Sequence, residues 1–165
     1  VPDLRFASSG MTRRVSGRTP ARPWGSGGLA NCHPRYSEAE IARLAEWVLT
    51  ELGPDVPLHF TAFHPDYRML DRGPTPPATL TRARRIAMDN GVRYAYTGNV
   101  HDTQGSSTWC HSCGELLIKR DWYQLGHWGL TENGSCANCG TTLPGHFEAK
   151  PGSFGPHRIP VSINR

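Results

Sequence analysis

Four of the five cysteines fall into two Cys-x-x-Cys pairs, and this spacing constrains the chain more than any other feature. Cys110 and Cys113 form the first pair and Cys136 and Cys139 form the second, with 22 residues between the pairs. A glycine follows each pair directly, which allows a tight backbone turn around the sulfurs. Two such pairs supply four thiolates, the ligand set of a closed tetrahedral zinc site. The sequence therefore predicts one structural zinc site that organises the C-terminal third of the chain.

Two unrelated pairs of buried or redox-active thiols are the alternative interpretation of this pattern. The separation slightly exceeds the roughly 15–20 residues that are commonest in zinc sites. His111, His127 and His146 lie nearby, and we expect them on the surface or around the site, because four thiolates already fill a tetrahedral coordination sphere. Cys32 has no partner cysteine close in sequence, and we expect it to be a free thiol.

The distribution of charge argues against a nucleic-acid-binding protein. The chain has 165 residues and a net charge of +4. Residues 1–36 contain six arginines and one aspartate, a net charge of +5, so the remainder carries −1. Phosphate binding needs a clustered basic face on the folded part of a protein. No stretch is long and apolar enough to span a membrane, and no apolar segment near the start resembles a secretory signal. Paired cysteines without such a signal favour a reducing compartment, so we expect a cytoplasmic protein.

Regular structure is expected only after residue 36. Residues 1–36 show neither helical nor strand periodicity, and we interpret them as a disordered or non-native leader. The Ser-x-x-Glu sequence at Ser37 is typical of a capping box at a helix start. Apolar spacing, glycines and prolines then predict an alternation of helices and strands, at about 38–52 (helix), 56–63 (strand), 79–90 (helix) and 92–97 (strand).

This alternation is typical of βα units with parallel strands. Two strands cannot by themselves form a parallel sheet that is buried on both faces. We therefore expect residues 37–100 to be the end of a larger α/β domain. Glycine, polar residues and cysteines dominate after residue 101, which predicts a zinc ribbon at 101–148 and a Pro- and Gly-rich tail at 149–165. Residues 116–118 and 122–130 are the expected ribbon strands.

Two stretches resemble a known family. Residues 55–69 read DVPLHFTAFHPDYRM and residues 94–102 read YAYTGNVHD, and the two cysteine pairs follow them. This combination resembles the C-terminal half of AmmeMemoRadiSam-system radical S-adenosylmethionine enzymes, which are relatives of the pyruvate formate-lyase activating enzymes. The similarity covers about residues 37–162. The fold class that it implies is α/β: the C-terminal portion of a partial (β/α)6 barrel, of the TIM-barrel kind, followed by a zinc-ribbon-like module.

The resemblance also implies a chemistry. Family members bind a 4Fe–4S cluster on a C-x-x-x-C-x-x-C loop and reductively cleave S-adenosylmethionine to a 5′-deoxyadenosyl radical, which acts on a protein or a small molecule. This sequence contains no C-x-x-x-C-x-x-C. We therefore expect a truncated member that is inactive alone, and whether the chain is itself an enzyme stays open.

Three polar residues at expected strand ends are candidates for contact with the cofactor. The resemblance places His64 against bound S-adenosylmethionine, and Asn99 and His101 follow the next strand. Barrel enzymes carry their chemistry at this end of the strands. The alternatives are a histidine that is hydrogen bonded within its loop, and ordinary turn residues.

Smaller expectations concern packing. His59 either lines the barrel interior or is partly buried. Tyr94 and Tyr96 are expected in the core, and Trp109, Trp122 and Trp128 around the ribbon.

Two other functions remain open on the sequence. The ribbon could be a binding module for a protein or a nucleic acid, or one Cys-x-x-Cys pair could be a redox dithiol. Zinc-free protein with a disulfide that cycles under dithiothreitol would support the second.

Overall fold

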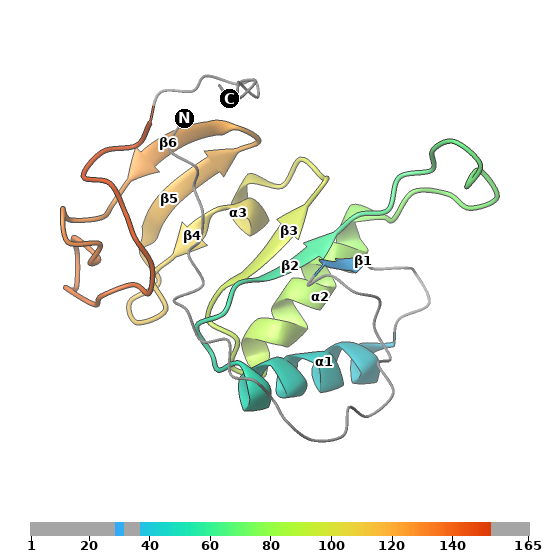
Figure 1. The fold of residues 1–165 in the computed structure, drawn as a ribbon, viewed down its shortest axis with the longest axis horizontal. Coiled ribbons are helices and arrows are strands. Elements are labelled where there is room, and N and C mark those ends of the chain that lie inside the picture. The colour runs from blue at the N-terminus through green and yellow to red at the C-terminus, as the bar shows by residue number, and fades with distance from the viewer. Residues whose placement is uncertain (1–28, 32–36, 153–165) are drawn as a thin grey trace, which may run out of the picture.

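The chain forms two small sheets that lie side by side (Figure 1). The computed structural model describes residues 29–31 and 37–152. The elements in chain order are β1 (Leu29–Asn31), α1 (Glu38–Glu51), β2 (Leu58–Thr61), α2 (Pro77–Asp89), β3 (Ala95–Gly98), α3 (Thr103–Ser106), β4 (Thr108–Trp109), β5 (Leu116–Asp121) and β6 (Gln124–Trp128). The first sheet has the order β1-β2-β3 with parallel pairing. The second has the order β4-β5-β6 with antiparallel pairing.

Helix α1 begins with the predicted capping box. The Glu40 backbone N–H donates to Ser37 Oγ at 3.3 Å, and the Ser37 N–H donates to a Glu40 carboxylate oxygen at 2.8 Å. The helix ends at Glu51, and Gly53 follows with a φ of 90°, a conformation that favours glycine.

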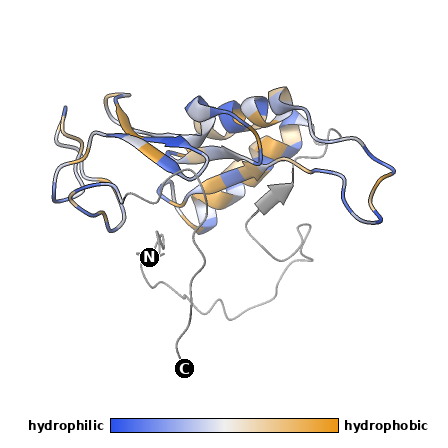
Figure 2. Ribbon diagram, turned by 90° about the horizontal axis from the view of Figure 1, so that it is seen from above, coloured by the Kyte–Doolittle hydropathy of each residue, from blue (hydrophilic) through white to orange (hydrophobic). Residues whose placement is uncertain are grey.

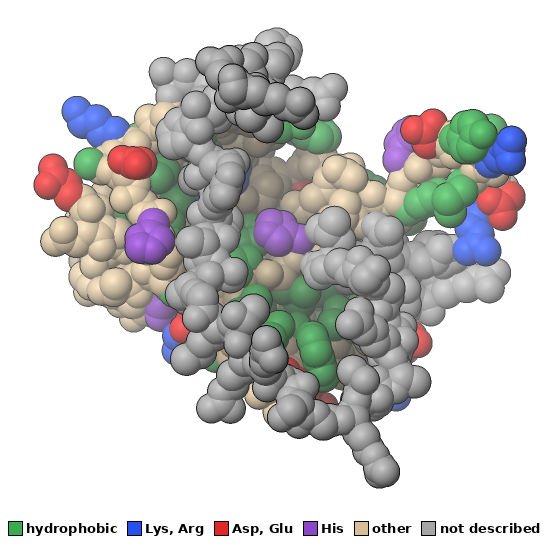
Figure 3. Space-filling model, viewed as in Figure 1, with side chains coloured by type: hydrophobic (Ala, Val, Ile, Leu, Met, Phe, Trp, Pro, Cys, Tyr) green, Lys and Arg blue, Asp and Glu red, His purple; other side chains and the backbone are tan. Residues whose placement is uncertain are grey.

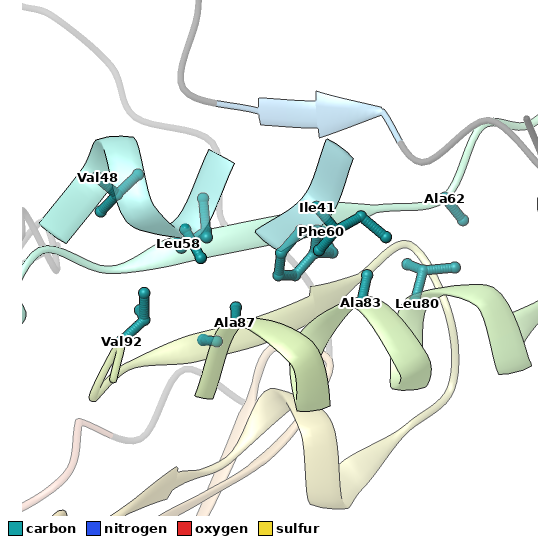
Figure 4. Packing of buried hydrophobic residues seen from close by; sticks show 11 residues of the cluster. Ile41, Val48, Leu58, Phe60, Ala62, Leu80, Ala83, Ala87 and Val92 are labelled. Atoms are coloured by element: carbon teal, nitrogen blue, oxygen red, sulfur yellow. The ribbon is translucent and has the colours of Figure 1, made fainter. Parts of the chain in front are cut away.

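Both long helices cover the same face of the parallel sheet. The apolar side chains of α1, β2 and α2 form one buried cluster there (Figure 4). Its fully buried members include Phe60 on β2 and Leu80 on α2. Figure 2 shows that hydrophobic residues line the sides of these elements that face one another. This burial is the main force that stabilises the βα part, because each helix has only one apolar stripe to cover.

Buried and half-buried side chains alternate along β2, as the sequence predicts. Leu58, Phe60 and Ala62 are buried toward the helices, while His59 and Thr61 point to the other face and are half-buried. The structure confirms parallel pairing of β2 with β3. Strand β3 differs from β2, because Tyr96 on its second face and Tyr94 directly before it are also buried, in a cluster with residues after 101. The boundary expected near residue 101 is therefore crossed by a shared core.

Strand β1 is a departure from the sequence analysis. We expected no element within residues 1–36, yet Leu29–Asn31 pairs with β2 in parallel. A strand of three residues is too short to show a period, and its partner strand lies far along the chain. The rest of the expected leader, Cys32 and most of the tail lie outside the described residues. The described strands form two open sheets and no closed barrel, so membership of a barrel stays a prediction.

The loop between β2 and α2 projects away from both sheets (Figure 1). It carries charges of both signs together with apolar side chains (Figure 3), and Tyr67 and Leu70 are 78% and 70% exposed. None of the described helices has the length and apolar character that crossing a membrane would require.

Replacing Phe60 with alanine tests the core between the helices and the sheet. Phe60→Ala should lower the free energy of unfolding by about 3–5 kcal/mol, because it leaves a cavity in a closed core. Urea denaturation followed by circular dichroism measures this change. Leu70→Ala in the exposed loop is the control and should change stability by less than about 0.5 kcal/mol. An equal change in the free energy of unfolding for both variants would show that Phe60 does not lie in a closed core.

Candidate metal centre

The four paired cysteines converge on one point. Their sulfurs all lie within 4.8 Å of one another. Cys110 Sγ is 3.6 Å from Cys139 Sγ, and Cys113 Sγ is 3.8 Å from Cys136 Sγ. These separations are far longer than the roughly 2.05 Å of a disulfide. They match the spacing of about 3.8 Å that a tetrahedral ion with metal–sulfur bonds of about 2.3 Å requires. The group can therefore hold a single metal ion such as zinc.

The two pairs have the same backbone geometry. In each, the N–H of the first cysteine donates to the carbonyl oxygen five residues later, at 2.8 Å for both Cys110 and Cys136. The N–H of the following glycine donates back to the carbonyl of that cysteine, at 2.9 Å for Gly114 and 2.8 Å for Gly140. These glycines have φ values of 74° and 75°. A glycine after each pair is thus required by backbone conformation, because L side chains rarely adopt it.

Each pair has one buried and one exposed sulfur. Cys110 and Cys136 are buried, whereas Cys113 and Cys139 are exposed. Burial raises the pKa of the Cys110 thiol to about 11. Hydrogen bonding from the Thr141 side chain and backbone lowers the pKa of Cys139 to about 6. A metal ion would have to displace the proton of Cys110, so metal binding is coupled to proton release.

No histidine of residues 37–152 belongs to this group of potential ligands. His111 lies between the first two cysteines in sequence, but its Nδ1 is 2.8 Å from the Tyr94 hydroxyl. The two rings meet edge to face at 5.9 Å. His127 and His146 are exposed, and neither belongs to the described group of potential ligands. Asn138 instead places its amide Nδ2 3.6 Å from Cys113 Sγ.

A second hydrophobic cluster supports the centre. It contains the two buried ligand cysteines, apolar side chains of the ribbon and two tyrosines of the parallel sheet. Its buried members are Tyr94, Tyr96, Cys110, Leu117, Ile118, Leu130, Cys136 and Leu143. The expected ribbon strands correspond to β5 and β6, whose pairing is antiparallel.

The tryptophans differ in how they relate to this cluster. Trp128 packs against it, and Trp109 donates from Nε1 to the Gln104 carbonyl at 3.0 Å. Trp122 is 59% exposed, so the expectation that it packs around the ribbon is wrong. The physical reason is the pairing of Asp121 with Gln124, which leaves Trp122 in the two-residue turn with a φ of 53°.

The three residues expected to contact a cofactor are separate from this centre. His64 is exposed, and its Nδ1 lies 3.0 Å from the Pro65 carbonyl oxygen. Asn99 is exposed in the turn after β3 with a φ of 57°, which a turn residue explains. His101 Nε2 is 3.0 Å from Asp121 Oδ1, at an open depression of about 480 Å³. Within residues 37–152, no hydrogen bond or ion pair joins the three to one another.

One group of polar side chains around Tyr96 was not expected from the sequence. The His59 ring stacks on Tyr96 with 5.1 Å between centroids, and the Arg120 guanidinium lies 5.8 Å from the same ring. His59 was expected to line an interior or to pack. The sequence around Arg120 shows no distinguishing pattern, because the residues of β5 alone do not reveal which other strand they contact.

Comparison with known proteins gives one informative similarity. The chain is 40% identical over 113 residues to Uncharacterized protein MJ0808 from Methanocaldococcus jannaschii. The aligned region is 67% of this chain and 34% of that protein, so the chain spans about a third of its relative's length. No family model and no solved structure matches.

The conformation of Gly140 gives a test of the backbone turn around the second cysteine pair. Gly140→Ala should lower stability by about 1–2 kcal/mol, because alanine is strained at this φ although nothing lies within 4 Å of its Cβ position. Gly140→Asn should lower stability by a smaller amount, since asparagine tolerates this conformation. Thermal unfolding of the metal-loaded protein measures both. Gly73→Ala is the control, because Gly73 lies in open space without a positive φ. If it lowered stability as much as Gly140→Ala, the positive φ of Gly140 would not be the cause of the loss.

Removing one ligand tests the metal centre itself. Cys136→Ser should abolish tight metal binding and expose residues 101–148 to limited proteolysis, because the second cluster contains two ligand cysteines. Helices α1 and α2 should stay protected, since their cluster shares no residue with it. Cys32→Ser is the matched control and should retain the ion. Equal loss of protection before and after residue 101 would show that the two cores depend on one another.

Proposed function

We propose that this chain is the C-terminal part of a radical S-adenosylmethionine enzyme of the AmmeMemoRadiSam type. Its βα units would form part of the barrel wall, and the cysteine centre would hold structural zinc. The resemblance of residues 55–69 and 94–102 supports this assignment, as does the cysteine ribbon that follows them. A relative about twice as long as this chain is consistent with further barrel strands in related proteins.

The observation that carries the proposal is the difference between the two faces of the parallel sheet. Helices α1 and α2 both cover one face. The other face presents His59, Thr61 and Tyr96, which are polar or aromatic. In a doubly wound sheet, helices cover both faces and the strands are apolar on both sides. A barrel wall instead has helices outside and functional side chains at its inner face and strand ends.

The residues present do not fit the iron–sulfur cluster of the family. Such a cluster would need three thiolates from one C-x-x-x-C-x-x-C loop, which this sequence does not contain. The four sulfurs of the ribbon are spaced for a single ion. A closed set of four thiolates leaves no coordination position for a substrate, so its role would be structural. No step of a radical reaction is therefore assigned to residues of this chain.

Metal analysis and cofactor cleavage test the proposal together. Protein purified without oxygen should contain about one zinc and no iron per chain. With a strong reductant and S-adenosylmethionine, it should release no 5′-deoxyadenosine. The longer relative MJ0808, reconstituted with iron and sulfide, should release it under the same conditions. Cleavage by this chain alone, or none by the relative, would contradict the assignment.

Two further observations on the same purified protein would indicate one of the two other functions instead. Zinc-free protein with a disulfide that cycles under dithiothreitol would indicate a dithiol redox protein. Salt-dependent binding to random DNA or RNA that survives deletion of residues 1–36 would indicate a nucleic-acid-binding module.

A further inference from the structure

The tip of the β5–β6 hairpin lies beside the turn that follows β3 (Figure 1). The two segments enclose an open depression of about 480 Å³, lined by His101, Asp121, Trp122, Tyr123 and Gln124. His101 Nε2 lies 3.0 Å from Asp121 Oδ1 and so joins the turn to the hairpin. Ligands of α/β sheets usually bind at the carboxyl ends of the strands, and this turn follows that end of β3. The depression is therefore placed where a binding site is expected.

Trp122 has a backbone conformation that its side chain does not favour. It is the first residue of the two-residue turn between Asp121 and Gln124, and its φ is 53°. Turns of this length ordinarily have glycine or asparagine where φ is positive. A bulky aromatic residue in this conformation is an outlier, and such outliers cluster at functional sites. The turn gains nothing from this side chain, so contact with a ligand would explain it.

Two neighbouring aromatic rings at the hairpin tip are open to water. Trp122 is 59% exposed and Tyr123 is 54% exposed. Tryptophan and tyrosine are, together with arginine, the commonest anchor residues of protein interfaces. Their rings also attract cations, and the attraction is strongest for tryptophan. The tip therefore presents two rings that suit a positively charged partner group.

Asp121 supplies the negative charge that such a group requires. Its Oδ1 accepts the His101 Nε2–H, because an ionised carboxylate can only accept hydrogen bonds. Within residues 37–152, Oδ2 has no hydrogen-bond donor and no lysine or arginine pairs with this carboxylate. A guanidinium group matches these partners best, since it stacks on aromatic rings and donates two parallel hydrogen bonds to a carboxylate.

The open shape of the depression indicates how the guanidinium is presented. Pockets for small molecules are usually clefts that bury most of the ligand. This depression is open, and one hairpin tip and one turn supply all of its lining. It can receive the end of a long side chain while the backbone that carries this side chain stays outside. An arginine of another protein therefore fits it better than a free small molecule.

We propose that Asp121, Trp122 and Tyr123 form a docking site for an arginine side chain of a partner protein. Asp121 accepts hydrogen bonds from the guanidinium, the two rings pack against it, and His101 positions the carboxylate. The site contains none of the four cysteines and requires no radical chemistry. It therefore goes beyond the proposed function and can be right or wrong independently of it.

Titration with short peptides tests this site in the full chain loaded with zinc. The probe is a tripeptide with blocked ends, in which arginine lies between two glycines. Matched tripeptides contain lysine, or citrulline, which has the shape of arginine without its charge. NMR at pH 8 follows the ring signals of His101 and the side-chain amide of Gln124. The arginine peptide should shift these signals saturably, with a dissociation constant of about 1–10 mM for a single charged group.

The matched probes distinguish the chemistry of the ligand and its source. The lysine peptide should bind more weakly, because its ammonium is a point charge, and the citrulline peptide should cause no saturable shift. Methylguanidine carries the same charged group without a peptide and should also bind more weakly. If methylguanidine bound as tightly as the arginine peptide, the assignment to a partner protein would be overturned.

Replacing Trp122 with glycine separates the aromatic ring from the turn. Trp122→Gly should leave the thermal midpoint unchanged or raise it, because glycine favours the positive φ, yet it should weaken binding of the arginine peptide about fivefold or more. Tyr67→Gly is the matched control, since Tyr67 is also an exposed aromatic residue, with a φ of 51° in another loop. It should leave binding unchanged. Equal binding by the two variants would contradict the role of Trp122.

Replacing Asp121 with asparagine tests the carboxylate. Asp121→Asn keeps the shape of the side chain and should weaken binding about tenfold or more, because it removes charge-assisted hydrogen bonds. Asp89→Asn removes the same charge from an exposed position of α2 and should change the dissociation constant by less than about twofold. Zinc content and circular dichroism check folding, and Trp122→Gly decides the question if Asp121→Asn is unfolded. Absence of saturable shifts with the arginine peptide, or equal weakening by Asp89→Asn, would overturn the proposal.

Discussion

Strand β3 is covered by a different core on each of its faces, and both halves of the molecule depend on this strand. Ala95 faces the cluster of α1, α2 and β2, whereas Tyr94 and Tyr96 face the cluster of the cysteine ribbon. Burial on both faces is typical of a strand inside a parallel sheet. Here the second covering layer is an antiparallel ribbon instead of helices. The tyrosine hydroxyls make this contact specific, because Tyr94 bonds to His111 and Tyr96 to Thr108.

The ribbon has few buried apolar side chains, and a module of this kind is expected to need further stabilisation. Its buried aliphatic side chains are few, and two of the buried residues are ligand cysteines. Small modules of this kind gain their stability from a metal, since the binding free energy contributes directly to folding. The tyrosines of β3 extend the cluster, so the parallel sheet also stabilises the ribbon. A bound metal and the contact with the parallel sheet would therefore stabilise the same buried cluster.

Local patterns predicted the parts of this structure that depend on local physics. The capping box at Ser37, the alternation at Phe60 and the cysteine spacing each follow from hydrogen bonding, pleat geometry or ligand geometry over a few residues. The three-residue strand β1 was missed, because it depends on pairing with a distant edge and has no pattern of its own. The turn position of Trp122 was missed for a related reason, since the register of two strands determines it. The contact of Arg120 with the Tyr96 ring depends on the relative placement of two sheets, which no local pattern encodes.

The unequal burial of the four sulfurs has a consequence for how a metal ion would leave. Cys113 and Cys139 border solvent, whereas Cys110 and Cys136 lie in the second cluster. A competing chelator would meet the two solvent-facing ligands first, one from each pair. The buried sulfurs would release a bound ion last, once the cluster around them opens. Exchange of a bound ion would then proceed in two stages, and the packing of β3 against the ribbon would control the second.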